Sequence, residues 1–520
     1  MSNEHTIHYA LRITQLMHFL PIIGLEIHVR LKTQSKMFCA CPNVGEDAPP
    51  NTSLCPVCTG QPGALPALNA AAIKLGVRAG LALGCRIPTE SHFDRKNYFY
   101  PDLPKGYQIS QYDFPISLGG SIELDIPSTN EIRDMRYEIR NHIRIGITRA
   151  HLEEDAAKNI HDAKTNTTLV DFNRSGTPLL EIVTEPDFRS PLEAKTFLQE
   201  LQMILRTIGA SDADMERGFM RCDANISLLP VDEKNLPLQA EYNPKIEIKN
   251  LNSFKAVERG LAYEIKRQTE LYQKNEKPQG ATRGWNEHEE VTFEQRLKET
   301  NADYRYFPEP DLPPLFLKEI AESERAQLPE LPAAKRLRLQ EEHGFSTNDV
   351  NFLVANDGWA DYAEKVMSEL QEEKRETRNE KRAKLVSGWL TSKLAGLLAQ
   401  KHLTINELKI TAENFAEFIH LIDEGVIGSA NAQKLLTLMV DTGTDPSHLL
   451  EEHNLGQHED PKLIQETVKR LIKENPDQVA QVKAGKLGVI KWFVGGVMKV
   501  TEGRANPTKV EEEIRKQLGV

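Results

Sequence analysis

The stretch Gly24-Leu25-Glu26-Ile27-His28-Val29-Arg30-Leu31 alternates between apolar and polar side chains. Because successive side chains of a strand point to opposite faces, this alternation predicts a β-strand with one apolar and one polar face. Glu26 and His28 are then neighbours on the polar face, about 7 Å apart along the strand. A carboxylate beside an imidazole can bind a divalent cation, but any solvated face of an antiparallel sheet can show the same alternation. On its own, this short strand favours the second interpretation.

Several other segments repeat this alternation and add acidic side chains to the polar face. Such strands are predicted over residues 143–147, 179–185, 221–228 and 245–249, the first leading into His151-Leu152-Glu153-Glu154-Asp155. The acids that these segments carry are Glu153, Glu154, Glu181, Glu185, Asp223 and Glu247. A face with this many carboxylates must bind cations or repel itself, and hard oxygen ligands favour Mg²⁺, whose sites leave positions for phosphate oxygens. We therefore interpret this face as an active site.

The bulk composition bounds the class of protein. A chain of 520 residues exceeds one ordinary core, so we expect about two to four domains. The net charge of −12 argues against a globally basic nucleic-acid binder, although it permits local basic patches. No apolar run approaches the length of a membrane span, and the N-terminus lacks the pattern of a secretory signal. Residues 1–21 are predicted to be a disordered extension, and no membrane association is expected.

Four of the six cysteines form a spaced set. Cys39-x-Cys41 and Cys55-x-x-Cys58 are separated by thirteen residues rich in proline, as in zinc knuckles. Disulfides are the alternative, but the other two cysteines lie far along the chain in apolar segments, which fits a reducing compartment better. The spacing therefore predicts a closed structural Zn²⁺ site, and the chain is expected to be cytoplasmic. A descendant that kept the cysteines without the metal is the remaining alternative.

An aromatic and basic loop is predicted over residues 94–107. In it Arg95, Lys96 and Lys105 alternate with Tyr98 and further aromatic side chains. Such a loop can stack on a base or an adenine while its cations contact phosphates. A rigid, proline-braced packing loop explains the same residues equally well. A partial echo at residues 304–313 is too short to establish a duplication.

The predicted fold class is α+β, because the strands are interspersed with helices up to about residue 310. Residues 22–310 are predicted to form a catalytic cradle on an antiparallel sheet that carries the zinc-knuckle loop. After this region the strand signals end, and we expect an all-α domain over 311–426 and a helical tail domain over 427–520. Between residues 483 and 509 the tail has six basic residues and one acid. This segment predicts either a contact with a phosphate backbone or ordinary solvated helices.

The chain lacks the common nucleotide-binding and protease motifs. It has no P-loop, no Gly-x-Gly-x-x-Gly opening a helix and no His-Glu-x-x-His. Its longer motifs instead resemble the GatB family, the B subunits of aspartyl/glutamyl-tRNA amidotransferases. The resemblance runs from about residue 22 to the C-terminus and rests on residues 24–29, 39–58, 94–111, 151–158, 171–187, 220–227, 247–253, 303–313 and 503–507.

The resemblance implies a two-step activity on RNA. Members of this family bind tRNA(Gln) or tRNA(Asn) misacylated with Glu or Asp and use ATP and Mg²⁺ to phosphorylate the side-chain carboxylate. Ammonia from a glutaminase A subunit then displaces phosphate, and a small C subunit completes the heterotrimer. Since ammonia is the nucleophile, this chain needs no nucleophilic Cys or Ser. The tail resembles the helical module with which the family contacts tRNA.

With this resemblance we assign roles to the residues singled out above. The expected Mg²⁺ ligands are Glu26, His28, Glu153, Glu154, Glu185, Asp223 and Glu247. Glu26, His28 and Glu154 are expected to be catalytic, with Lys96 and Lys105 facing phosphate. Arg95, Lys96 and Tyr98 are expected to bind the nucleotide, and Cys39, Cys41, Cys55 and Cys58 the zinc ion.

Two other classes of protein remain as alternatives. A non-catalytic RNA-binding scaffold would bind through the zinc loop and the tail, so Glu26→Ala would spare the activity of the complex. A metal-dependent phosphotransferase acting on a free carboxylic acid would turn over ATP with free glutamate or aspartate and would not need the tail.

Overall fold

The computed structural model describes residues 18–44, 48–126, 140–162, 164–232, 234–297, 304–370, 376–456, 461–501 and 505–520. The chain forms two compact units, Met1–Leu331 and Pro332–Val520. Most of the predicted N-terminal extension lies outside the described residues. Its last four residues, 18–21, are the start of the first strand.

The first unit is organised around β1 (His18–Arg30), which contains the stretch predicted as a strand. The strand order of the main sheet is β14-β13-β12-β11-β1-β10-β7-β5, with β6 paired to β7. The bounds of the other strands are β5 (Ser117–Leu118), β6 (Ser121–Asp125), β7 (His142–Glu154), β10 (Pro178–Thr184), β11 (Met220–Val231), β12 (Ile246–Leu251), β13 (Ala281–Asn286) and β14 (Val291–Leu297). Neighbours are antiparallel except β12 and β13. The α+β prediction with an antiparallel sheet is confirmed.

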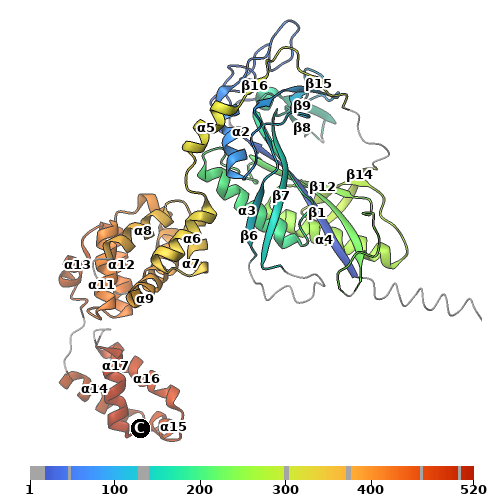
Figure 1. The fold of residues 1–520 in the computed structure, drawn as a ribbon. Helices are drawn as coiled ribbons and strands as arrows, with labels where there is room; N and C mark the ends of the chain where they lie inside the picture. Colours follow the sequence, from blue (N-terminus) through green and yellow to red (C-terminus); the bar gives the residue numbers. More distant parts are fainter. Residues whose placement is uncertain are drawn as a thin grey trace, which may run out of the picture. The chain divides into compact units, whose positions relative to one another are not determined.

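Helices cover the apolar face of this sheet. Figure 1 shows α2 (Ala70–Ala82), α3 (Pro191–Thr207) and α4 (Phe254–Gln273) beside the long strands. The apolar side chains of β1, among them Leu25 and Ile27, are fully buried in one cluster with side chains of all three helices. Each such side chain stabilises the fold by roughly 1.5–3 kcal/mol. Packing this face onto helices leaves the polar side chains of the same strands on the opposite face.

Small sheets connect the remaining segments of the first unit. β3 (Asp94–Asn97) pairs with β4 (Tyr107–Ser110) and with β15 (Phe307–Pro308), so the aromatic loop and its partial echo lie side by side. β2 (Glu90–Ser91) pairs with β16 (Leu315–Phe316), and β8 (Lys158–Asp162) pairs with β9 (Thr167–Asp171). α5 (Lys318–Ala326) packs against α2, where Arg78 and Glu324 form an ion pair of 2.6 Å. Residues 311–331 therefore belong to the first unit rather than to the helical region predicted to begin at 311.

The second unit is helical. Its helices are α6 (Pro332–His343), α7 (Thr347–Ala355), α8 (Trp359–Glu369), α9 (Glu376–Gly388), α10 (Ala395–Lys401), α11 (Ala412–Asp423), α12 (Ser429–Thr442), α13 (Pro446–Glu452), α14 (Pro461–Glu474), α15 (Pro476–Lys483), α16 (Ile490–Val500) and α17 (Pro507–Leu518). One hydrophobic cluster spans Leu339 to Leu455 and another spans Ile464 to Leu518. The two cores thus separate after α13, later than the boundary predicted at 426/427. Among the described helices, none combines the length and apolar character needed to cross a membrane.

Candidate active site

The strand register brings two histidines and a glutamate into one row on the polar face of the sheet. His28 of β1 lies opposite Glu181 of β10, and Glu181 lies opposite His151 of β7. The Nε2 atoms of His28 and His151 are each 3.3 Å from Oε2 of Glu181. Directly opposed residues of paired strands share a face, which explains why these three side chains meet.

A second glutamate completes this arrangement. Oε1 of Glu153 is 3.7 Å from Nε2 of His28, and Ser110 Oγ donates a 3.3 Å hydrogen bond to Oε2 of Glu153. One ligand atom each from His28, Glu153 and Glu181 lies within 4.8 Å of the others. We call these three residues the His28 cluster. Two carboxylates and one imidazole at this spacing can hold a divalent cation that retains open positions.

Burial and mutual charge set the protonation of this site. Burial opposes the charged form of His151, but Glu181 and Glu153 outweigh it and raise its pKa to about 9. Burial is also the largest effect at His28, yet Glu181 and Glu153 raise its pKa. Burial favours protonated carboxyls, but His151 and His28 hold the pKa of Glu181 well below its usual range, and His151 and Lys96 lower that of Glu153. Both carboxylates are therefore favoured in the ionised form, whereas His28 must lose its proton before it can bind a metal ion.

Three of the predicted metal ligands lie further along the same polar face. Glu26 is opposite Asp223 of β11, and its Oε1 accepts a 3.0 Å hydrogen bond from Asn225. Lys249 of β12 lies 2.6 Å from Asp223 and 2.9 Å from Glu247. Asp223 and Glu247 thus share an ammonium partner, while Glu26 accepts from a neutral amide.

The structure does not bring Glu154 into the His28 cluster. Glu153 and Glu154 are consecutive on β7, so their side chains leave opposite faces of the strand. Glu154 lies on the side of Leu152, which is fully buried in the core against α2. There it forms an ion pair with Lys105 and accepts a 3.0 Å hydrogen bond from the backbone N–H of Ile109. Glu154 and Lys105 thus pair with each other apart from the His28 cluster, and their roles as a metal ligand and a phosphate contact stay predictions.

Glu185 is also separate from the cluster. The register between β10 and β7 shifts at Val183/Thr184, because β7 carries an extra residue there, Thr148. Thr184, the last residue of β10, accepts a 2.9 Å hydrogen bond at Oγ1 from the backbone N–H of Leu25, and Glu185 follows the end of the strand. Glu185 is exposed and accepts a 2.7 Å hydrogen bond from Thr148.

Two of the predicted nucleotide-binding residues lie close to the His28 cluster. The ammonium of Lys96 is 5.1 Å from the ring centroid of Tyr304. Burial opposes its charge, but Glu153, with further groups, raises its pKa. Tyr98 donates a 3.3 Å hydrogen bond to Gln108, and its pKa is raised, mainly by burial. Lys96 is therefore a cation that faces the same carboxylates as a bound metal ion would.

Arg95 is engaged by the echo segment. Its guanidinium forms two hydrogen bonds with the buried carboxylate of Glu309, at 2.7 and 2.8 Å, and lies 3.2 Å from Asp311. It also stacks over the ring of Tyr107 at 4.4 Å. This bidentate pair joins β3 to the segment around β15, which gives Arg95 a packing role, and its nucleotide contact stays a prediction.

Removing Glu309 should therefore destabilise the first unit. Glu309→Ala leaves the Arg95 guanidinium without its buried partner, and we expect a loss of roughly 3–5 kcal/mol in the free energy of unfolding. Asp311→Ala removes the more exposed contact of the same guanidinium and should cost less than about 1 kcal/mol. Urea denaturation followed by tryptophan fluorescence measures both, and equal losses for the two variants would contradict this ranking.

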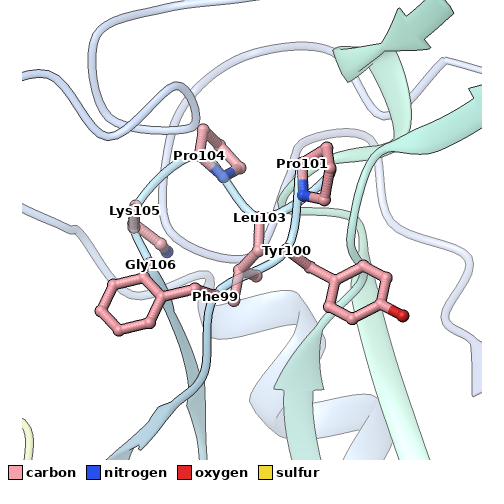
Figure 2. A pocket seen from close by; sticks show the side chains of 7 residues that line it. All are labelled: Phe99, Tyr100, Pro101, Leu103, Pro104, Lys105 and Gly106. Carbon is pink, nitrogen blue, oxygen red and sulfur yellow. The ribbon is translucent and has the colours of Figure 1, made fainter. Parts of the chain in front are cut away.

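Two hollows lie near these residues. One of about 340 Å³ is adjacent to Glu26, and its lining includes Thr184, Asn225, Tyr242 and Lys245. The other, of about 500 Å³, is formed by Phe99, Tyr100, Pro101, Leu103, Pro104, Lys105 and Gly106. Figure 2 shows the rings of Phe99 and Tyr100 pointing away from one another at its edge.

The four predicted metal-binding cysteines come together. One Sγ atom each from Cys39, Cys41, Cys55 and Cys58 lies within 4.8 Å of the others, and the Sγ atoms of Cys55 and Cys58 are 3.9 Å apart. A tetrahedral site with metal–sulfur bonds of about 2.3 Å would place its sulfurs roughly 3.8 Å apart. The set is thus compatible with a structural metal.

The surroundings of these thiols favour a thiolate. A hydrogen bond from Cys39 lowers the pKa of Cys58 to about 4 although burial opposes the shift. The backbone N–H of Cys55 and the ammonium of Lys36 also contribute. Lys36 is fully buried, with Nζ 3.7 Å from Cys58 Sγ and 2.8 Å from the carbonyl oxygen of Ser53.

Several residues of this face had no predicted role from the sequence. Glu181 lies in a predicted strand and His151 in the segment that the predicted strand 143–147 leads into, but neither was assigned as a site residue. Arg149 and Lys249 were not assigned either. The rule of two that identifies β1 applies to residues 149–154 of β7 as well. It would have placed Arg149, His151 and Glu153 on one face and Glu154 on the other.

Two domain families of known proteins match this chain. Residues 21–322 match the GatB/GatE catalytic domain and residues 371–518 match the GatB domain. The chain thus combines the catalytic domain and the C-terminal domain of an amidotransferase component. It belongs to the GatB family, the B subunits of aspartyl/glutamyl-tRNA(Asn/Gln) amidotransferases, which are ligases.

The similarity to curated members is nearly full-length. The chain is 43% identical over 507 residues to the B subunit of the aspartyl/glutamyl-tRNA(Asn/Gln) amidotransferase of Thermotoga maritima, covering 96% of this chain and 99% of the relative. It is 44% identical over 505 residues to the corresponding protein of Thermomicrobium roseum, with the same coverages. The corresponding protein of Crocosphaera subtropica is 42% identical over 503 residues, covering 96% of this chain and 97% of the relative.

Proposed function

We propose that this protein phosphorylates the side-chain carboxylate of misacylated Glu-tRNA(Gln), Asp-tRNA(Asn) or both, using ATP and Mg²⁺, and then amidates it with ammonia. The observation that carries the proposal is the His28 cluster, in which two ionised carboxylates and an imidazole face one point on the polar sheet face. The names of the relatives support tRNA as the substrate.

The proposed reaction needs metal-binding carboxylates from this chain but no nucleophilic side chain. In the first step a side-chain oxygen of the substrate attacks the γ-phosphorus, the bond to ADP breaks and an acyl phosphate forms. In the second step ammonia attacks the acyl carbon, inorganic phosphate leaves and a proton is lost to give the amide. Phosphoryl transfer depends on positioning and on neutralising charge, so this chain needs no covalent nucleophile.

Mg²⁺ would be held by His28, Glu153 and Glu181, with Glu26 on the same face. When bound, it would offset negative charge on the phosphoryl oxygens. Lys96 adds a positive charge near the same carboxylates. His151 holds the carboxylates of Glu153 and Glu181 from the side away from His28 and keeps them ionised.

Zn²⁺ is the metal proposed for the cysteine set, because four thiolates close a tetrahedron and leave no position for a substrate. Its role is to hold the loop of residues 39–58 next to residues 171–176, where Ser175 Oγ donates a 3.0 Å hydrogen bond to the carbonyl of Cys58.

The proposed partners are a glutaminase A subunit that supplies ammonia, a small C subunit and the misacylated tRNA, in a cytoplasmic heterotrimer. The proposed division of labour assigns catalysis to the first unit, Met1–Leu331, and tRNA contacts to the last helical core, Ile464 to Leu518. The helical core of Leu339 to Leu455 lies between them in the chain.

The experiment that tests this function is co-purification with the partner proteins followed by amidation assays on both misacylated tRNAs. We expect product that requires ATP, Mg²⁺ and glutamine or ammonia, and ATP hydrolysis that depends on misacylated tRNA. ATP turnover with free glutamate or aspartate would favour the small-molecule phosphotransferase. Full activity of Glu26→Ala would favour the non-catalytic scaffold.

Removing the last helical core should weaken RNA binding selectively. In the tail, Lys483, Lys486, Lys491 and Lys499 are exposed on or next to α15 and α16, whereas Glu502 and Arg504 lie outside the described residues. Truncation after residue 456 removes the separate core of Ile464 to Leu518. We expect the KM for tRNA to rise roughly tenfold or more, with a weaker salt dependence, because phosphate contacts are lost. Nucleotide titration should show ATP binding within about twofold of the full chain, and an unchanged KM for tRNA would contradict the role of the tail.

A further inference from the structure

The polar face of the sheet carries buried polar atoms that the described part of the chain does not satisfy. They are Nε of Arg149, Nδ1 of His151, Nε of Arg221 and Oδ1 of Asn225. The first two belong to β7 and the last two to β11, the strands that flank the pair β1 and β10. Buried polar groups without a partner are costly in a protein, so their grouping on one face indicates a ligand or water that completes them.

The strand register places Arg149 on the polar face that carries the His28 cluster. It lies opposite Val183 of β10, and Val183 lies opposite Glu26 of β1. Arg149 and Glu26 therefore occupy the same row of the polar face, about two strand spacings apart, or roughly 10 Å between Cα atoms. His151, whose ring contacts Glu181, is two residues further along β7 on the same face.

Arg221 and Lys249 on this face pair with carboxylates, whereas Arg149 pairs with none of the carboxylates that the structure describes. Arg221 lies 2.9 Å from Asp155 and Lys249 lies 2.6 Å from Asp223. Arg149 makes no ion pair or hydrogen bond through its side chain to any residue that the structure describes. A guanidinium whose Nε is buried without a partner is free to donate to an anionic ligand, and its planar fork matches the oxygens of a phosphoryl group.

We propose that Arg149 is a substrate-binding residue that donates hydrogen bonds to phosphoryl oxygens of the bound ATP. This inference rests on the proposed function, because the same face is proposed to hold Mg²⁺ and the triphosphate. Phosphate is favoured over the carboxylate of the aminoacyl group because the acids of this face repel a free carboxylate. These acids attract a triphosphate only through the metal ion that they bind. A guanidinium beside them lowers the repulsion that remains between the acids and the triphosphate.

Arg149→Met and Arg149→Lys in the full chain, with its partner proteins, test this assignment. Arg149→Met should weaken binding of a non-hydrolysable ATP analogue with Mg²⁺ at least about tenfold and lower kcat about 100-fold, as for loss of one charged donor to a transferring group. Arg149→Lys should recover part of the lost ATP binding and turnover. In a third variant, Arg149→Ala, free guanidinium added to the assay should partly restore turnover. The KM for misacylated tRNA should change by less than about twofold. The melting temperature should stay close to that of the wild type, because the side chain has no partner to lose.

Arg144→Met is the matched control. Arg144 lies on the same strand but is exposed and donates a 2.9 Å hydrogen bond to Ser121, so its loss should leave ATP binding and turnover unchanged. If Arg149→Met binds and turns over ATP like the wild type, or if only its KM for tRNA rises, the assignment is overturned while the proposed function stands. If the wild-type complex itself shows no ATP-dependent amidation, both fail.

Discussion

Glu153→Gln is expected to abolish ATP-dependent amidation, with a loss of at least about 10³-fold in kcat. The substitution keeps the size of the side chain but removes a charge from the His28 cluster, where Glu153 lies 3.7 Å from His28 and next to His151. Without that charge the site would hold a divalent cation poorly, and the phosphoryl oxygens would lose their neutralising partner. Measuring kcat at increasing Mg²⁺ concentration tests this prediction. High Mg²⁺ should restore only part of the kcat of Glu153→Gln.

Glu185→Gln is the control for this prediction. The sequence alone includes Glu185 with the metal ligands, whereas the structure leaves it exposed beyond the end of β10, hydrogen-bonded to Thr148. We expect its turnover within about twofold of the wild type. Equal losses in Glu153→Gln and Glu185→Gln would contradict the assignment of the metal site to the His28 cluster.

Cys58→Ser is expected to release the structural metal and lower the stability of the first unit. Structural zinc sites contribute about 10–16 kcal/mol of binding free energy in isolated fingers, of which a larger fold loses only a part. We expect the free energy of unfolding to fall by roughly 3 kcal/mol or more. Elemental analysis should show the loss of about one zinc ion per chain, and thermal denaturation should show a lower midpoint.

Cys85→Ser separates metal loss from the general cost of changing a buried cysteine. Cys85 is buried in the main core, away from the four-cysteine set, so this variant should keep its zinc and lose only about 1–2 kcal/mol. Full zinc content in Cys58→Ser, with an unchanged melting temperature, would count against a metal role for the cysteines.

Local patterns in the sequence predict those parts of the site that depend on neighbours along the chain. The period of two around Glu26 and His28 identifies β1 and its polar face, and the spacing of Cys39, Cys41, Cys55 and Cys58 identifies the cysteine set. Both predictions depend on the spacing of residues along the chain, so long-range contacts do not change them.

The remaining parts depend on contacts that a sequence does not display. Which of Glu153 and Glu154 faces the cluster depends on the phase of β7, where an extra residue, Thr148, interrupts the alternation without a sequence signal. Arg95 and Lys105 look available from the sequence, but Glu309 and Glu154 neutralise them from distant segments. The boundary predicted at 310 misses the packing of α5 on α2, which is also a long-range contact.

The central claim is that His28, Glu153 and Glu181 hold a divalent cation on the polar face of the sheet. Crystals of the full chain soaked in Mn²⁺ with an ATP analogue test it most directly, through the anomalous scattering of the metal. We expect a peak about 2.1 Å from a ligand atom of each of these three residues, lost in Glu153→Gln. A peak bound by Glu154 or Glu185 instead, with the three residues unligated, would contradict the account.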